Sequence, residues 1–547
     1  MTKRFVLIAA LALIIGLPFW LRPKENAGGG GAGSPAGAGP LAEVLVVITP
    51  HNEAIRHEFG RGFAEWHRER TGRCVVIDWR VVGGTSEIAR FLEGEYGAAF
   101  ELHWRRDLGR AWSAEARAAF HNGRLPADAS AVEREARAAF LVSEVGCGID
   151  VFFGGGTYDF ERQARAGRIV DSGVLRAHPE WFREEVIPRV FAGEEYWDGE
   201  GRWFGTVLSS YGIVVNFDAL ARLGVPWPRQ WEDLRNARLA GEIALADPTK
   251  SGSIAKAFEN VIQQQMQRRF VALRAAREDA GGGALEARAV REGWLEGLRL
   301  VQGIGANSRY FTDSSQKPPV DVAQGDSAAG LCIDFYGRQQ EEAVARRAGS
   351  ARVGFVSPAG GSVASVDPVA LLRGAPHRET AVLFIEYVLS MEGQKLWNFK
   401  PGAPGGPRQY ALRRLPVRRD FYERPEFSAW RSDPEVSPYG QGEQLVYRAA
   451  WTGGLFREMA FVIRVMCLDT HPELVRAWRA IIEAGMPAEA LAAMQDLSAV
   501  DYDAARTRIK QALASRNRAD EIRLADELAH AFRRQYRAAE RLARGKN

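Results

Sequence analysis

Short, unbroken apolar runs alternate with amphipathic stretches from residue 44 onward, and this alternation restricts the possible folds more than any other feature of the chain. Residues 44–48, 75–82 and 149–153 are runs of the kind that form strands buried on both faces of a parallel sheet. After the first run, Asn52 is a candidate helix N-cap. The residues that follow form one apolar stripe at helical spacing: Ile55, Phe59, Phe63 and Trp66. The succession predicts an α/β domain with a parallel sheet.

A second unit of the same kind follows the first. Residues 203–217 are extended and apolar, 241–246 form a strand, 254–270 a helix and 328–335 another strand, and 353–372 are extended again. We therefore expect two α/β lobes. The first is formed by 41–208, with a helical insertion at about 95–145. The second is formed by 209–358, the chain returns to the first lobe over 359–420, and a C-terminal helical region, 421–547, packs on the lobes.

The N-terminus has the pattern of an export signal. Lys3 and Arg4 precede an apolar run over 5–21, which Arg22, Lys24 and Glu25 end. Residues 1–26 are predicted to be a signal peptide or an uncleaved membrane anchor, because the run is near the lower limit for a membrane span. Residues 27–40, almost all Gly, Ala, Ser and Pro, predict a flexible linker. Either reading places the rest of the chain outside the cytosol, in the periplasm or an equivalent space.

Charge and cysteine content exclude several classes of function. The 72 basic and 68 acidic residues leave a net charge of +4, which gives no strong field for nucleic acid. The four cysteines form no C-x-x-C motif, so a zinc or redox site is not indicated. They are expected to be buried thiols, with a disulfide between Cys74 and Cys147 as the alternative.

Three predicted strands end in small polar loops that begin helices: 49–52, 83–86 and 247–253. In open α/β sheets ligands bind at the carboxyl ends of strands, where helix N-termini attract anions and polar oxygens. Gly154, Gly155 and Gly156 fit neither a phosphate-binding P-loop nor a dinucleotide fingerprint, and they suit close approach of backbone to a ligand. The chain contains no G-x-S-x-G and no H-E-x-x-H motif. Hydrolytic chemistry therefore finds little support.

Several motifs together are similar to a known family. They are residues 48–53 (ITPHNE), 77–80 with 83–87 (IDWR, GGTSE), 148–155 (GIDVFFGG), 241–253 (GEIALADPTKSGS), 325–337 (GDSAAGLCIDFYG) and 392–397 (EGQKLW). Over residues 41 to about 422 the chain resembles the family 1 extracellular solute-binding proteins of ABC transporters, especially the iron-type branch. The resemblance implies a type II periplasmic binding fold, whose two lobes close on a ligand, here with extra peripheral and C-terminal helices.

The resemblance also implies which residues contact the ligand: Thr49, His51, Gly84, Thr85, Ser86, Gly155, Ser210, Ser251, Gly252, Ser253 and Tyr336. Relatives that bind ferric iron directly use two adjacent tyrosines. Here Phe335 precedes Tyr336, and Tyr310 is the other candidate donor. Helix N-termini and hydroxyls suit an oxyanion, or a phosphorylated or carboxylated molecule, better than iron.

These features lead to one expected function and two alternatives. The expected function is the solute-binding component of an ABC importer: a monomer without a cofactor that delivers a small ligand to a membrane permease. The first alternative is a membrane-tethered ligand sensor, which needs the same cleft. The second is an exported hydrolase that uses His51 with a carboxylate in the cleft.

Overall fold

The computed structural model describes residues 42–547 except 277–281, 440–443, 516, 546 and 547. The N-terminal signal or anchor and the linker lie outside the described residues. No described helix is long and apolar enough to span a bilayer.

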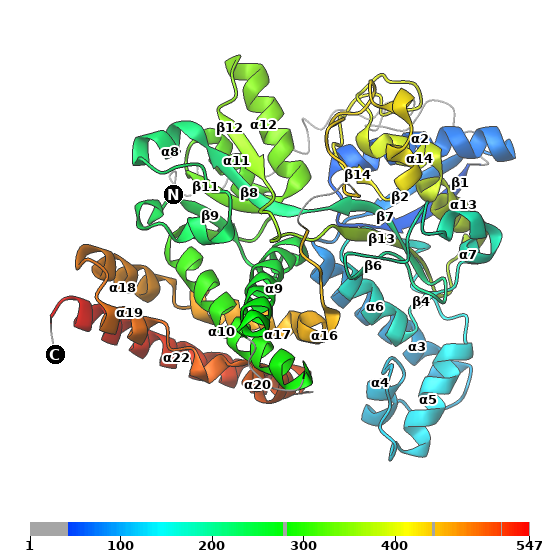
Figure 1. The fold of residues 1–547 in the computed structure, drawn as a ribbon. Coiled ribbons are helices and arrows are strands. Elements are labelled where there is room, and N and C mark those ends of the chain that lie inside the picture. Colours follow the sequence, from blue (N-terminus) through cyan, green and yellow to red (C-terminus); the bar gives the residue numbers. More distant parts are fainter. Residues whose placement is uncertain (1–41, 277–281, 440–443, 516, 546–547) are drawn as a thin grey trace, which may run out of the picture. The chain divides into compact units, whose positions relative to one another are not determined.

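Two sheets form the centres of two α/β lobes, so the expected two-lobed fold is confirmed (Figure 1). Lobe 1 holds seven strands, six of them in the order β14-β7-β13-β3-β1-β2, with β4 beside β13. In chain order they are β1 (Glu43–Ile48), β2 (Val75–Arg80), β3 (Val151–Phe153), β4 (Ile169–Val170), β7 (Trp203–Ser209), β13 (Ser365–Leu372) and β14 (Leu415–Pro416). β1 and β3 are parallel, whereas β13 is antiparallel to both β3 and β7.

Lobe 2 is built on five strands in the order β10-β9-β11-β8-β12. They are β8 (Tyr211–Asn216), β9 (Ile243–Ala246), β10 (Ser308–Thr312), β11 (Ala329–Ile333) and β12 (Val353–Val356). The chain crosses between the sheets where Ser210 separates β7 from β8, and again between β12 and β13. The strand expected over 328–335 ends earlier, because α12 begins at Asp334.

Helices cover both sheets. Those of lobe 1 are α2 (Glu53–Thr71), α3 (Thr85–Arg106), α4 (Ala114–Ala119), α5 (Ala131–Val142), α6 (Thr157–Ala166), α7 (Val174–Ala177), α13 (Arg378–Leu389), α14 (Met391–Asn398) and α15 (Arg419–Tyr422). Those of lobe 2 are α8 (Phe217–Leu223), α9 (Gly252–Ala275), α10 (Gly282–Ala306), α11 (Lys317–Gln324) and α12 (Asp334–Ala348). The Asn52 side chain accepts a hydrogen bond from the backbone N–H of Ile55, which confirms the predicted N-cap of α2.

The C-terminal helices share one apolar core with lobe 2, whereas lobe 1 has a core of its own. The C-terminal helices are α16 (Ala449–Thr452), α17 (Phe456–Ile463), α18 (His471–Glu483), α19 (Ala488–Met494), α20 (Tyr502–Ala504), α21 (Lys510–Ala514) and α22 (Arg518–Ala543). Between 423 and 448 the described chain is irregular apart from one 3₁₀ turn, Pro425–Phe427, so the helical region begins later than residue 421. All four cysteines are free thiols, so Cys74 and Cys147 form no disulfide. Cys332 and Cys467 are buried as expected, whereas Cys74 is exposed and Cys147 half-buried.

Candidate functional site

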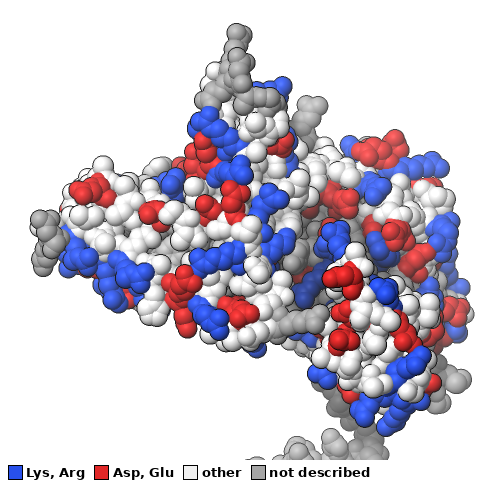
Figure 2. Space-filling view, turned by 90° about the horizontal axis from the view of Figure 1, so that it is seen from below, with Lys and Arg blue, Asp and Glu red and all other residues white. Residues whose placement is uncertain are grey.

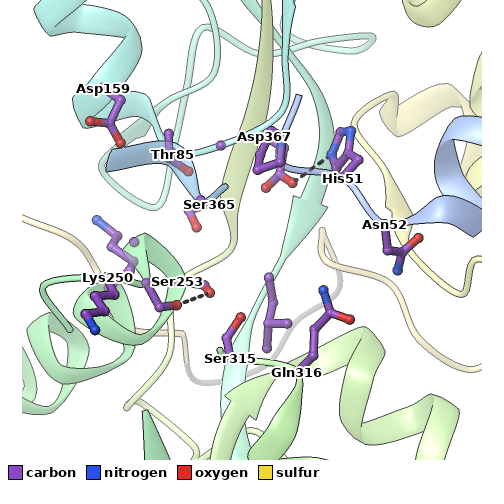
Figure 3. Close-up of a pocket in the computed structure, with 18 of the residues that line it drawn as sticks. His51, Asn52, Thr85, Asp159, Lys250, Ser253, Ser315, Gln316, Ser365 and Asp367 are labelled. Carbon is purple, nitrogen blue, oxygen red and sulfur yellow. Dashed lines mark hydrogen bonds and ion pairs between the residues drawn. The ribbon is translucent and has the colours of Figure 1, made fainter. Parts of the chain in front are cut away.

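A cleft of about 810 Å³ lies between the two lobes. It is lined by loops at the carboxyl ends of β1, β3 and β9, by the starts of α3, α6 and α9, and by part of β13. Figure 3 shows His51, Thr85 and Asp159 of lobe 1 on one side of this cleft, and Lys250, Ser253 and Ser315 of lobe 2 on the other. The parallel strands of both lobes therefore deliver their loops to one shared space.

Eight of the residues expected to contact a ligand line the cleft, and four candidates do not. Those in the lining are His51, Gly84, Thr85, Gly155, Ser251, Gly252, Ser253 and Tyr336. Thr49 is buried and accepts a hydrogen bond from the backbone N–H of His51. Ser86 lies outside the lining, and Ser210 pairs with Ser357 at 2.9 Å. The Tyr310 hydroxyl donates a hydrogen bond to Asp321, within lobe 2.

Two helices of lobe 1 begin at the cleft without a side-chain cap. Gly84 and Gly156 are the N-caps of α3 and α6, and neither has a side chain that could satisfy the first backbone N–H groups. In lobe 2, Ser251 caps α9 by accepting from the N–H of Ile254 and lies 3.2 Å from the Ser253 hydroxyl, oxygen to oxygen. These helix ends carry positive partial charge and free donors, the properties that bind anions.

The two lobes approach closely at these helix ends. A Cβ atom on Gly84 would lie 3.0 Å from the backbone oxygen of Lys250, and one on Gly252 would lie 3.9 Å from Oγ1 of Thr85. Gly155 has φ +131°, and a Cβ there would lie 2.7 Å from Cγ2 of Thr85. The glycines therefore let backbone from both lobes reach one point in the cleft.

His51 lies at the end of β1 with its ring against Phe153. Its Nε2 is 3.5 Å from Oδ2 of Asp367, and its buried Nδ1 has no hydrogen-bond partner among the described residues. Burial lowers the pKa of His51, with Arg414 and Arg56 acting in the same direction against Asp367. The imidazole is therefore neutral at neutral pH.

A buried ion pair forms the floor of the cleft. Nη1 of Arg414 lies 2.7 Å from Oδ2 of Asp367, and the Arg414 guanidinium also bonds the Ser209 hydroxyl. Burial would raise the pKa of Asp367, but the nearby Arg414 and His51 outweigh it and lower the pKa. Sequence reasoning missed both partners. The available signal was Asp367 itself, a charge inside the apolar run 363–372.

Other ionisable residues at the cleft were also missed. Burial raises the pKa of Asp159, in the first turn of α6, to about 6. Nε of Arg56 is buried without a hydrogen-bond partner among the described residues. Lys250 pairs with Asp313 at 2.8 Å. Helical position alone does not reveal that such charges face a cleft.

The surroundings of Tyr336, the candidate iron ligand in the cleft, affect its pKa. Burial raises the pKa of Tyr336 to about 12, against the opposing effects of Arg414 and a hydrogen bond with Asn52. Tyr310, bonded to Asp321, is not in the cleft lining. The described residues contain no cluster of three or more His, Cys, Asp or Glu side chains suited to a metal ion.

A segment from the C-terminal region spans the two lobes beside the cleft. We call residues 444–456 the strap. The backbone N–H of Tyr447 donates to Ala192 of lobe 1, and its hydroxyl donates to Glu259 of lobe 2 at 3.0 Å. Lys256 of α9 lies 2.5 Å from Glu194 of lobe 1 and 2.9 Å from Glu259, beneath the Tyr447 ring.

Comparison with known proteins identifies part of this architecture. Residues 149–416 match the family described as bacterial extracellular solute-binding protein. This match, over just under half of the chain, agrees with the family that the motifs resemble.

The curated proteins that match parts of this chain have low sequence identity to it. An uncharacterised protein of Haemophilus influenzae is 26% identical over 249 residues, which is 45% of this chain and 60% of that protein. The phosphoglycerate transport regulatory protein PgtC of Salmonella typhimurium is 23% identical over 189 residues, or 35% of this chain and 39% of that protein. The chain thus spans less than two thirds of the length of these curated relatives.

Solved structures of periplasmic binding proteins are similar at low identity. AfuA of Actinobacillus pleuropneumoniae, solved with fructose-6-phosphate, is 16% identical with a TM-score of 0.47, over 81% of this chain and 99% of that one. Iron-bound HitA of Pseudomonas aeruginosa is 15% identical with a TM-score of 0.44, over 77% and 99%.

Proposed function

We propose that this chain is the extracytoplasmic solute-binding component of an ABC importer, and that it captures a small phosphorylated or carboxylated anion between its lobes. The observation that carries the proposal is the meeting of two helix N-termini. The start of α3 in lobe 1 and the start of α9 in lobe 2 both line the cleft, and a Cβ atom on Gly84 would lie 3.0 Å from the Lys250 backbone oxygen. Two positive helix ends that line one cleft favour an anion bound in that cleft.

Contacts from both lobes give such a ligand a way to close the protein. A ligand shifts a conformational equilibrium only by its difference in affinity for the two states. An anion held by the start of α3 and by Ser251 and Ser253 would gain its second set of contacts only when the lobes meet. The closed form would then be the one presented to the permease. The name of the Salmonella relative concerns phosphoglycerate, a molecule of the class we propose.

Ferric iron ranks below an anion. Iron prefers several hard oxygen donors. Of the two predicted iron ligands, Tyr336 and Tyr310, only Tyr336 lines the cleft, together with the phenols of Tyr158 and Tyr211. Burial raises the pKa of Tyr336 to about 12, which disfavours the phenolate that iron would need.

Thermal-shift screening of the chain from residue 41 onward tests the proposal. The panel contains inorganic phosphate, sugar phosphates, phosphoglycerates, simple carboxylates and ferric citrate. A ligand that binds only the folded state should raise the melting temperature by mass action. We expect phosphorylated molecules to do so. Stabilisation by ferric salts alone, with a visible phenolate-to-iron absorption band, would overturn the ranking.

Thr85→Val and Ser86→Ala form a matched pair at the start of α3, because Thr85 lines the cleft and Ser86 does not. The Thr85 change should weaken binding of the stabilising ligand by about 1–3 kcal/mol, whereas the Ser86 change should have little effect. If the two variants lost equal binding free energy, the ligand would have to bind away from the Thr85 side chain.

The sensor alternative uses the same cleft and differs in its membrane partner. The word "regulatory" in the name of the Salmonella relative favours it. Deleting the gene in the source organism distinguishes a transport function from a sensor function. Loss of ligand uptake supports transport, whereas unchanged uptake with a lost transcriptional response supports sensing.

The hydrolase alternative is favoured by the proximity of His51 to Asp367, 3.5 Å apart. Asp367 is engaged by Arg414 in the closer contact, which favours a structural role for this carboxylate. We expect no turnover of phosphoesters or carboxylic esters by the purified protein. Turnover that His51→Ala abolishes would favour the hydrolase.

A further inference from the structure

A second cavity, of about 640 Å³, lies in lobe 1 away from the cleft, between the helical insertion and the end of α6. It shares no lining residue with the cleft. Its lining is Glu93, Ala118, His121, Asn122, Gly123, Arg124, Arg162, Arg165, Ala166 and Arg168.

The cavity has an excess of positive charge. Four arginines and one glutamate line it. Arg165 also lies 3.7 Å from Glu161, outside the lining, so two carboxylates offset part of this positive charge. Glu93 is already engaged, because Oε2 lies 3.3 Å from Nη2 of Arg162 and Oε1 lies 3.9 Å from Nε2 of His121. Figure 2 shows basic and acidic side chains interspersed over the face seen from below.

Arg168 is the central observation, because its side chain is charged, only 2% exposed and incompletely bonded. One of its terminal nitrogens donates to Gln163 Oε1 at 2.8 Å, but Nε has no hydrogen-bond partner among the described residues. Burial lowers the pKa of Arg168 to about 10, with Arg162 and Arg137 acting in the same direction. A desolvated guanidinium is stabilised when an anion supplies the missing acceptor.

His121 gives a second unsatisfied group at the same cavity. Its Nδ1 is buried without a hydrogen-bond partner among the described residues. Burial, assisted by Arg168, lowers its pKa to about 4, so the ring is neutral at neutral pH. A neutral imidazole can donate one N–H to an oxyanion without adding to the charge.

The walls of the cavity are fixed in place. Arg137 of α5 donates to the backbone oxygens of Phe120, Arg165 and Ala166, which joins the insertion to the end of α6. The backbones pack so closely that a Cβ atom on Gly123 would lie 2.4 Å from the Arg165 oxygen. The arginines are thus presented by a rigid frame, which reduces the entropic cost of binding.

We propose that this cavity is a second anion site, separate from the cleft, which binds a phosphate group through Arg168, Arg124 and Arg165 with His121 as a neutral donor. Guanidinium groups match the geometry of phosphate oxygens, and several around one cavity suit a dianion. Free phosphate, a phosphorylated metabolite and a lipid headgroup all present this group.

The test follows His121, because its ring reports on this cavity and not on the cleft. The His121 ring resonances are recorded by NMR while the full chain is titrated with inorganic phosphate, then with sulfate. We expect a saturable shift of these resonances and a higher His121 pKa in the bound form. Arg124→Gln/Arg165→Gln, at two exposed positions, should weaken this response about tenfold or more. Arg117→Gln, an exposed arginine of α4 outside the lining, is the matched control and should leave it unchanged.

Arg168→Gln is the more severe variant, and circular dichroism establishes whether it folds. If Arg168→Gln does not fold, the double variant Arg124→Gln/Arg165→Gln still tests the proposal. Sedimentation with phosphatidylcholine vesicles, with and without phosphatidic acid, separates the sources. If the protein cosediments only with vesicles that contain phosphatidic acid, and the double variant does not, the ligand of the cavity is a lipid headgroup. If the protein responds to phosphate but does not cosediment, the ligand is a soluble molecule. Absence of any His121 shift with phosphate, sulfate and phosphatidic acid would overturn the proposal and leave the arginines as supports for the end of α6.

Discussion

The pair formed by Arg414 and Asp367 is predicted to stabilise the fold because each charge is buried against the other. Arg414→Met would leave the Asp367 carboxylate without its cation. We expect a loss of about 3–5 kcal/mol in the free energy of unfolding at pH 7, measured by urea denaturation. Adding Asp367→Asn to the same chain should recover much of that loss. A single variant as stable as the parent would show that the pair is exposed to solvent in the protein.

Asp159 should make ligand binding depend on pH. Its pKa is raised to about 6 by burial, with a smaller contribution from Glu87. Above this pH the ionised carboxylate repels an anion in the cleft, and below it the neutral acid does not. Affinity for a phosphorylated ligand should therefore rise as the pH falls from 7.5 to 5.5, by up to about tenfold.

Asp159→Asn is the matched variant for this measurement by calorimetry. It should bind more tightly than the parent at pH 7.5 and equally at pH 5.5. The ligand's own phosphate ionisation affects both proteins alike, so the ratio of their dissociation constants isolates Asp159. A ratio that does not vary with pH would contradict the prediction.

Among the elements, those with a local cause were predictable from sequence. The strand at 44–48 followed from its unbroken apolar run, and the start of α2 followed from Asn52. The loops before α3 and α9 were predicted as candidate binding elements for the same local reason. The end of β11 could not be predicted from sequence. Asp334 and Phe335 belong to the first turn of α12, although Phe335 continues the apolar run.

The charged groups of the cleft could not be placed from local sequence. Arg414 reaches Asp367 across 47 residues, and Tyr447 reaches Glu259 across 188. Such pairs depend on how the lobes and the strap pack, which no residue spacing within a single helix or strand encodes.

The strap and α9 are joined by a buried charge cluster whose removal should be costly. Lys256→Met would leave the Glu194 and Glu259 carboxylates buried without their cation, which should cost about 3–5 kcal/mol at pH 7. Burial raises the pKa of Glu194, and without Lys256 protonation becomes easier still. The loss should therefore be smaller at pH 5, where the carboxylates can become neutral.

Urea denaturation at the two pH values measures this prediction. Lys256→Met/Glu194→Gln/Glu259→Gln is the control, because it removes the buried charges together and should recover stability at pH 7. A loss for Lys256→Met that is equal at both pH values would show that burial of charge is not the cause.

At the scale of the whole molecule, Tyr447 of the strap should influence ligand affinity without touching the ligand. Tyr447 links the Ala192 backbone of lobe 1 to Glu259 of lobe 2 and does not line the cleft. Apparent affinity scales with the fraction of protein in the binding-competent form. Tyr447→Phe removes the hydroxyl bond to Glu259 of lobe 2 and keeps the backbone bond to Ala192 of lobe 1, so one end of the link is lost. This change of about 1 kcal/mol should make the ligand bind up to about fivefold more weakly.

Tyr502→Phe is the matched control, because its hydroxyl donates to the backbone oxygen of Trp451, a strap residue that packs in the core shared by lobe 2 and the C-terminal helices. Both variants lose one tyrosine hydrogen bond, but only Tyr447 is also bonded to lobe 1, through its backbone. Calorimetry with the strongest ligand of the thermal-shift panel should show weaker binding for Tyr447→Phe alone. Small-angle scattering should then show a larger radius of gyration for ligand-free Tyr447→Phe than for the parent, with the difference removed at saturating ligand. Equal affinities for the two variants would mean that the strap fixes the C-terminal helices to lobe 1 without biasing closure.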